Sequence, residues 1–368
     1  MAIDVGPLVG GRPTGIGLFT SRLLDGLERV QPAPRVIRYV LSARATLPPG
    51  VRRLPYPARA AHLAWGRFDH PRGERTLRGA DIVHGTNYVA PPTRRPTVIS
   101  VHDCTMITHR ELVHPVVRAF EPIVRRAVAR GAWVAVPSGH VEQQVRELFG
   151  ATKVRRIAYG SPAPPTTGGA GADRPVAIAT IGNRPFALAI ATREPRKNLP
   201  RLVSAYGLAR DSFPELALVI VGAPGPDDPA IERALDALRP SARADIVVLP
   251  YVSDLDRTSL LRTALLLAYP SLDEGFGFPA LEAMTIDLPV LAAAAGSLPE
   301  VCGDAAVLVD PLDTTSIATG LVRLATDPVL RHELQVAGRA QAARFSWADT
   351  AAGFATLYRD ALMEHRSA

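Results

Sequence analysis

Short apolar runs without charged residues alternate with helical patterns along most of this 368-residue chain, and this alternation constrains the fold more than any other feature. The runs at 216–222 and 246–252 are typical of strands buried on both faces of a parallel sheet. Repeated strand–helix alternation predicts an α/β fold with doubly wound parallel sheets. Because the chain is longer than one hydrophobic core usually allows, we expect two such domains with a cleft between them.

A change of composition marks the expected domain boundary. Residues 161–184 are dominated by Pro, Gly, Ala and Thr, which is typical of a linker. We therefore predict an N-terminal domain at 1–165 and a C-terminal domain at 180–346. A final helical segment is expected at about 347–368.

The net charge of +7 raises the question of an anionic partner. No basic run is interleaved with aromatic residues, so we exclude nucleic acid. Segment 116–130 separates arginines from apolar residues at helical spacing, and Pro122 should kink or interrupt it. We favour a domain helix with a solvated basic face, and weak association with an anionic membrane surface is the alternative.

Neither a membrane span nor a secretion signal is evident. No apolar stretch reaches the roughly 18 residues that a spanning helix needs, and the N-terminus lacks the basic-then-apolar order of a signal peptide. We expect a cytoplasmic protein, peripheral at the inner face of the membrane if the lipid alternative holds. Cys104 and Cys302 are far apart in sequence and lack ligand spacing, which argues against a disulfide framework and a zinc site.

The stretch 271–284 predicts an anion site. It follows an apolar strand at 265–270, and Pro279 opens a helix directly after a glycine-rich loop. Gly275 and Gly277 would let an anion approach the unpaired backbone N–H groups at the helix start, where the helix dipole favours negative charge. A diphosphate fits such a site.

Two glutamates bracket this loop. Glu274 precedes the glycines, and Glu282, expected in the first helical turn, points back toward the same place. Carboxylates accept hydrogen bonds strongly from hydroxyls but would repel the phosphate itself. The pair therefore indicates hydroxyl groups on either side of a phosphate.

Glu274 and Glu282, in the context EGFGFPALEAM and with GSLPEV at 296–301, resemble the Glu-x7-Glu signature of family 4 of the retaining nucleotide-sugar glycosyltransferases of GT-B fold. The resemblance implies two Rossmann-like domains facing across a cleft, with the C-terminal helix crossing back to the N-terminal domain. It also implies that Glu274 contacts the transferred sugar and Glu282 the ribose. Gly275, Phe276, Gly277 and Phe278 would line the donor.

The loop 192–198, TREPRKN, resembles the diphosphate-binding loop of that family. The resemblance implies that Lys197 and an arginine reach the donor diphosphate, and Arg193 and Arg196 both remain open for the second place. Cations suit this position because cleavage of the sugar–phosphate bond builds negative charge on the leaving group. A basic loop at a helix start has no clear structural reason, since the helix dipole disfavours cations there.

In the N-terminal half, Gly15 and Gly17 follow a short first strand. A third glycine and a matching acidic residue are missing, so we reject NAD or FAD binding. The resemblance instead places this loop at the cleft, near the donor phosphates and the acceptor, and we expect the natural start to lie several residues earlier.

Polar residues end the strands of the same half, at the edge where open α/β sheets hold ligands. His102 and Asp103 end one strand and Asn87 follows another. By resemblance, His102 lines the acceptor side of the cleft, with Asp103 and Asn87 beside it.

Two other chemistries are considered and set aside. Ser138 lacks a Gly-x-Ser-x-Gly elbow, so we expect it to cap a helix rather than act as a hydrolase nucleophile. Asp254 and Asp256 form an Asp-x-Asp pattern that could bind a metal ion. Together with Ser253, however, the pattern is more typical of a capped helix with an acidic first turn, so we expect no metal. By resemblance, backbone near Val252 faces the nucleotide base.

We therefore predict a retaining, metal-independent glycosyltransferase without cofactor. It would move a mannose, rhamnose, glucose or N-acetylglucosamine type of sugar from a nucleotide sugar to a hydroxyl acceptor, in cell-envelope polysaccharide, glycolipid or natural-product glycosylation. A non-catalytic nucleotide-sugar-binding protein and a nucleotide-sugar epimerase of the same fold are the alternatives. The residues leave open the sugar, the nucleotide, the acceptor and the oligomeric state.

Overall fold

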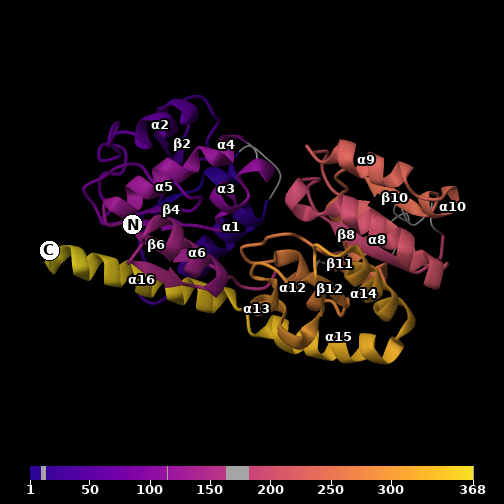
Figure 1. Ribbon diagram of the computed structural model, residues 1–368. Coiled ribbons are helices and arrows are strands. Elements are labelled where there is room, and N and C mark those ends of the chain that lie inside the picture. Colours follow the sequence, from indigo (N-terminus) through magenta and orange to yellow (C-terminus); the bar gives the residue numbers. More distant parts are fainter. Residues whose placement is uncertain (10–13, 114, 163–181, 368) are drawn as a thin grey trace. The chain divides into compact units, whose positions relative to one another are not determined.

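A computed structural model describes residues 1–9, 14–113, 115–162 and 182–367. The chain divides into two compact units, whose elements are labelled in Figure 1. Unit 1 comprises residues 1–160 and 345–368, and unit 2 comprises residues 161–344. The predicted linker falls largely on residues 163–181, which lie outside the described residues.

Unit 1 contains a parallel sheet of seven strands in the order β3-β2-β1-β4-β5-β6-β7. The order reverses at β1, which pairs with β2 on one side and β4 on the other. The carboxyl ends of β1 and β4 therefore flank a switch point, where open α/β sheets bind ligands. The strands are β1 (Ala2–Asp4), β2 (Ile37–Leu41), β3 (Arg52–Leu54), β4 (Val83–Gly85), β5 (Thr97–Ser100), β6 (Trp133–Val136) and β7 (Val154–Arg156).

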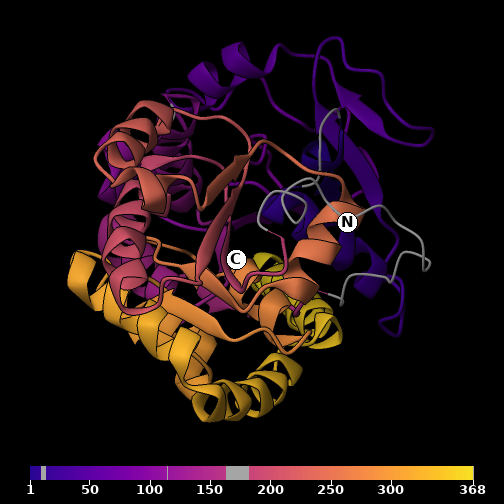
Figure 2. The same ribbon diagram turned by 90° about the vertical axis from the view of Figure 1, so that its right-hand side faces the viewer.

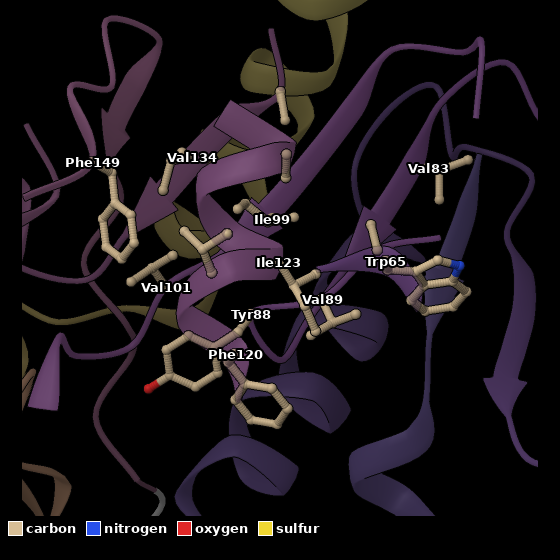
Figure 3. Close-up of a cluster of buried hydrophobic side chains, with 14 of the residues drawn as sticks. Trp65, Val83, Tyr88, Val89, Ile99, Val101, Phe120, Ile123, Val134 and Phe149 are labelled. Carbon is tan, nitrogen blue, oxygen red and sulfur yellow. The ribbon is translucent and has the colours of Figure 1, made fainter. Parts of the chain in front are cut away.

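Helices cover the unit 1 sheet and complete its core. Ile99 and Val134 of the strands pack with Phe120 and Ile123 of α5, and Trp65 of α2 joins the same cluster (Figure 3). The helices are α1 (Gly15–Leu27), α2 (Ala58–Trp65), α3 (Thr105–Thr108), α4 (Pro115–Arg118), α5 (Phe120–Ala129), α6 (Gly139–Phe149) and α16 (Trp347–Ser367), with 3-10 turns at Gly6–Leu8 and Arg110–Leu112.

The last helix, α16, belongs to unit 1. It packs against α1, where Gly26 leaves no room for a Cβ beside Ala351. The hydroxyl of Thr350 donates to the carbonyl of Ala158 (2.8 Å), and the Tyr358 hydroxyl bonds to Nδ1 of His84 (2.7 Å). The predicted return of the C-terminal helix to the first domain is therefore confirmed.

Unit 2 contains a parallel sheet of six strands in the order β10-β9-β8-β11-β12-β13. Every residue of β9 is buried, as expected for an apolar run without alternation. With two parallel, helix-covered sheets, the predicted fold class is confirmed. The strands are β8 (Phe186–Ile190), β9 (Ala217–Val221), β10 (Ile246–Leu249), β11 (Leu266–Tyr269), β12 (Val290–Ala293) and β13 (Val307–Val309).

Alternate strand residues of unit 2 face different helices. Ala187 and Ala189 of β8 share a core with Tyr206 of α8 and Leu321 of α14, and these two helices lie side by side (Figures 1 and 2). The helices are α8 (Leu199–Ser212), α9 (Asp228–Asp236), α10 (Pro240–Arg243), α11 (Asp254–Thr263), α12 (Phe278–Met284), α13 (Leu298–Cys302), α14 (Thr314–Thr326) and α15 (Pro328–Ala343), with 3-10 turns at Pro195–Lys197 and Gly303–Ala305.

The basic segment 116–130 forms two domain helices rather than the single helix expected, and arginines of the second are paired rather than simply solvated. It breaks at Ala119 between α4 and α5, and Pro122 lies in the first turn of α5, where its missing N–H costs nothing. The apolar side of α5 is buried in the core of unit 1. Arg126 and Arg130 both donate to Asp69 at 2.8 Å, which neutralises much of this face.

Candidate functional site

The basic loop of unit 2 is fixed by Asn198. This residue adopts a left-handed conformation (φ 59°) between the turn Pro195–Lys197 and α8. Its side-chain amide donates to the carbonyls of Pro270 (3.0 Å) and Pro311 (2.7 Å), which follow β11 and β13. The loop is therefore anchored to the carboxyl edge of the sheet, and the preceding Lys197 is held there.

Lys197 and Arg196 converge on the carboxylate of Glu274. The ammonium of Lys197 donates to one carboxylate oxygen, and the guanidinium of Arg196 donates to the other at 3.0 Å. Lys197 also donates to the Tyr269 hydroxyl at 3.3 Å. Glu274 is 7% exposed, so this ion-paired cluster is shielded from water.

The charges of this cluster depend on one another. Burial alone raises the pKa of Glu274, but the attraction of Lys197 and Arg196 outweighs it and lowers the pKa to about 2. Burial and the neighbouring Arg196 lower the pKa of Lys197, while Glu274 opposes them. Glu274 is therefore a carboxylate throughout the neutral range.

Glycine is required on both sides of Glu274. Gly277, the N-cap of α12, has φ 100°, and Gly296 has φ 61°, a region that side chains other than glycine rarely adopt. A Cβ on Gly296 would lie 2.7 Å from the amide nitrogen of Glu274, and the Ser297 amide donates to the Glu274 carbonyl at 2.9 Å. The GSLPEV segment therefore packs directly on the Glu274 backbone.

The rest of this loop lies between the two predicted glutamates. Gly275 follows Glu274 directly, and Phe276 is buried with its ring edge-on to Phe278, at 5.3 Å between centroids. Glu282 is the fifth residue of α12, so it lies in the second helical turn and the predicted first turn is wrong.

Glu282 is held by a residue that the motif does not contain. Both carboxylate oxygens of Glu282 accept hydrogen bonds from the guanidinium of Arg257, in α11. The helix is capped by Ser253, whose side chain accepts from the Asp256 amide at 3.1 Å, so the predicted cap is confirmed. Val252, half-buried, precedes this cap.

Of the two arginines left open by the sequence, Arg196 lies with Lys197. Arg193 instead pairs with Asp228 at 3.2 Å and donates to the carbonyl of Ala223 at 3.5 Å. These contacts bind Arg193 to the loop after β9 and to the start of α9. Arg196 is therefore the better candidate for sharing an anion with Lys197.

His102 lies at the carboxyl edge of the unit 1 sheet, and both of its ring nitrogens are occupied. Nε2 bonds to the carbonyl of Thr86 (2.7 Å), which only accepts, so Nε2 carries the proton. Nδ1 then accepts from the Tyr159 hydroxyl at 2.7 Å. Burial lowers the pKa of His102, so the ring is neutral.

The other predicted unit 1 residues lie around this edge. Gly15 opens α1, and the Gly17 amide donates to the capping hydroxyl of Thr14 at 3.2 Å. Asp103 accepts from the amide and hydroxyl of Thr105 at the start of α3. Asn87 has a buried side-chain oxygen without a partner in the described part of the chain.

Among the described residues, no group of three or more His, Cys, Asp and Glu side chains is arranged to hold a metal ion. Within the same ranges, no helix has both the length and the apolar character needed to cross a bilayer.

Comparison with known proteins identifies the family. The family model for glycosyl transferases group 1 matches residues 175–341. O-antigen chain mannosyltransferase B of Escherichia coli is 31% identical over 300 residues, covering 76% of this chain and 75% of that protein. This chain belongs to the group 1 glycosyltransferases.

Solved structures agree with the fold of this glycosyltransferase. Sucrose-phosphate synthase from Thermosynechococcus elongatus superposes with a TM-score of 0.71 at 18% identity, covering 98% of each chain. Anabaena Alr3699/HepE, in complex with UDP and glucose, gives 0.72 at 16% identity, covering 98% of this chain and 99% of that one. At such identities the likeness supports the fold.

Three residues that contact predicted site residues were not expected from the sequence. Tyr269, which contacts Lys197, ends an apolar strand, a position that could have marked it. Arg257 and Tyr159, which contact Glu282 and His102, carry no such signal, because their roles depend on which elements meet in space.

Proposed function

We propose that this glycosyltransferase transfers a sugar from a nucleoside diphosphate sugar to a hydroxyl acceptor, with retention of configuration at the anomeric carbon. The observation that carries the proposal is the convergence of Lys197 and Arg196 on Glu274 at the carboxyl edge of the unit 2 sheet. Two cations and a carboxylate at one place suit a donor with a phosphate end and a hydroxyl-rich end.

Lys197 and Arg196 would stabilise the leaving diphosphate. Negative charge grows on that group as the bond to the sugar breaks, and cations already in place stabilise it without reorganising. Amides near Gly277 and Phe278, at the start of α12, would add hydrogen bonds. With these charges supplied by the chain, the proposed reaction needs no metal ion.

Glu274 would bind the hydroxyls of the transferred sugar. Its low pKa and its two cationic partners make it a hydrogen-bond acceptor and a poor nucleophile. We therefore favour a mechanism in which the acceptor attacks the same face of the sugar from which the diphosphate leaves. The acceptor oxygen bonds to the anomeric carbon, the bond from that carbon to the phosphate oxygen breaks, and the acceptor proton passes to that phosphate oxygen.

On the acceptor side, His102 has no nitrogen available for proton transfer, so its proposed part is to shape the site. Asn87, with its unpartnered oxygen, and Asp103 would supply polar contacts. Gly15 and Gly17 would let ligand approach the start of α1.

The relatives suggest which ligands to test first. Similarity to O-antigen chain mannosyltransferase B supports mannose as the sugar and a cell-envelope polysaccharide or glycolipid as the acceptor. The UDP complex of Alr3699/HepE supports a nucleoside diphosphate in the same fold. GDP- and UDP-linked mannose, glucose, rhamnose and N-acetylglucosamine form the test panel.

Donor turnover and product stereochemistry test the proposal. Thermal-shift screening of the panel, with EDTA present, selects the donor, and ¹H NMR then follows slow hydrolysis and transfer. We expect a product with the donor's anomeric configuration. Inversion would refute retention, release of a new nucleotide sugar would indicate an epimerase, and binding without any turnover would indicate a non-catalytic protein.

We also propose that weak contact with anionic lipid uses α2 rather than α5. Arg59 and Leu63 lie one helical turn apart on α2, and Arg67 follows in the turn just after the helix ends. Leu63 is 57% exposed and Phe68 is 64% exposed. The two arginines are exposed and have no carboxylate partner in the described residues, unlike Arg126 and Arg130.

Co-sedimentation with vesicles tests this surface. Wild type should bind phosphatidylglycerol vesicles and not phosphatidylcholine vesicles, and Arg59→Gln with Arg67→Gln should reduce that binding several-fold. Arg110→Gln, which removes an exposed but paired arginine, is the control. Equal binding by all three proteins would exclude α2.

A further inference from the structure

Arg257 and Glu282 form a buried, two-pronged ion pair between α11 and α12. Each carboxylate oxygen accepts from one guanidinium nitrogen, and the side chains are 10% exposed for Glu282 and 28% for Arg257. The two helices follow β10 and β11, which are not neighbours in the sheet. The pair therefore joins two loop–helix segments that the sheet itself does not hold together.

The stability of the fold does not by itself explain this ion pair. Removing two charges from water costs several kcal/mol per ion, roughly what their attraction returns, so well-packed apolar residues would serve as well. A chemical role explains the pair better, because the family resemblance implies that Glu282 contacts the donor ribose.

The hydrogen-bonding capacity of Glu282 matches that role. An ionised carboxylate offers about four acceptor positions, and a bidentate arginine uses two of them. One position per oxygen then remains, and the two oxygens lie in a plane that the rigid guanidinium fixes. Two adjacent hydroxyls, as on ribose, can occupy these remaining positions together.

We propose that Arg257 is a positioning residue for nucleotide recognition, which holds the Glu282 carboxylate in the plane that accepts both ribose hydroxyls. The proposal rests on the proposed function and deepens it. A site built to bind a hydroxyl rejects the analogue that lacks it, because its polar group is left unpaired. Arg257 should therefore control discrimination between ribo- and 2′-deoxyribonucleotides.

Calorimetric titration with GDP, UDP and their 2′-deoxy forms tests the inference. For the base that binds, wild type should prefer the ribose form, and Arg257→Met should reduce this preference by about tenfold, the effect of one hydrogen bond to a charged group. Arg257→Lys keeps the positive charge but lacks the planar, bidentate guanidinium. Its preference for the ribose form should therefore lie between those of wild type and Arg257→Met. Arg262→Met, an exposed arginine of the same helix, should match wild type.

A double-mutant cycle separates positioning of the Glu282 carboxylate by Arg257 from general damage to the fold. If Arg257 acts through Glu282, adding Arg257→Met to Glu282→Gln should leave the preference of Glu282→Gln unchanged, and melting temperatures check that each variant is folded. An unchanged preference in Arg257→Met, or an equal loss for both nucleotide forms, would overturn the inference. Absence of GDP and UDP binding in wild type would overturn the proposed function and the inference with it.

Discussion

Replacing Glu274 by glutamine removes the negative charge between Lys197 and Arg196 while keeping the shape of the side chain. The pKa of this carboxyl is lowered from 4.5 to about 2, and one pKa unit corresponds to about 1.4 kcal/mol. Ionised Glu274 therefore contributes about 3 kcal/mol to folding at pH 7. Since the folded-state pKa is the lower one, this contribution is complete well above pH 4.5 and is lost as the pH falls through about 2.

Unfolding by urea, followed with two probes, checks this value. All three tryptophans, Trp65, Trp133 and Trp347, belong to unit 1, so their fluorescence follows that unit, whereas far-UV circular dichroism follows both. For Glu274→Gln, the free energy of unfolding should fall by about 3 kcal/mol at pH 7 and by about half of that near pH 3. This loss should appear in the transition followed by circular dichroism and not in the one followed by tryptophan fluorescence.

The matched control is Glu194→Gln. Glu194 also pairs with Arg196, at 3.3 Å, but its side chain is 39% exposed, so we expect a loss below about 0.5 kcal/mol. If the unfolding transition of Glu274→Gln were unchanged at pH 7, the claim that ionised Glu274 stabilises the fold through Lys197 and Arg196 would be refuted. A loss of unfolding free energy that does not shrink at pH 3 would refute it as well.

Four other substitutions probe the site. Lys197→Ala should weaken nucleoside diphosphate binding about tenfold or more in calorimetry, whereas Glu274→Ala should lower turnover by several orders of magnitude, and wild-type turnover there would contradict the role of Glu274. Tyr159→Phe leaves Nδ1 of His102 without its donor, so the melting curve of unit 1 should show a loss of about 1–3 kcal/mol. Gly296→Ala places a Cβ 2.7 Å from the Glu274 amide at a positive φ, so it should cost at least about 1 kcal/mol and reduce turnover.

Sequence patterns predicted the parallel sheets well, because uninterrupted apolar runs and capped helices are local signals. The run at 216–222 became β9, and Ser138 and Ser253 cap helices as expected. The missed elements include β3 and α2, in a stretch rich in Pro and Arg where local patterns are weak, and the helices α3, α9 and α10. The strand predicted at 246–252 ends at Leu249.

The candidate site was predictable only where its residues are close in sequence. Local sequence context and the family resemblance it carries pointed to Glu274, Glu282 and Lys197, because each lies in a motif on one strand–loop–helix segment. Arg257 lies in a separate helix, 25 positions from Glu282, and nothing in its own surroundings marks it. The choice between Arg193 and Arg196 likewise depended on Asp228, the first residue of α9, which follows the neighbouring strand β9.

Substitutions of Glu274 and of Lys197 should have opposite effects on nucleoside diphosphate affinity, although both residues belong to one cluster. Without donor, the carboxylate neutralises part of the positive charge of Lys197 and Arg196, so an arriving diphosphate must share these cations with Glu274. Glu274→Ala releases both cations, and nucleoside diphosphate affinity should stay equal or rise while turnover falls. Lys197→Ala should lower affinity instead. If Glu274→Ala weakened affinity as Lys197→Ala does, Glu274 would act by orienting the cations and not by binding the sugar.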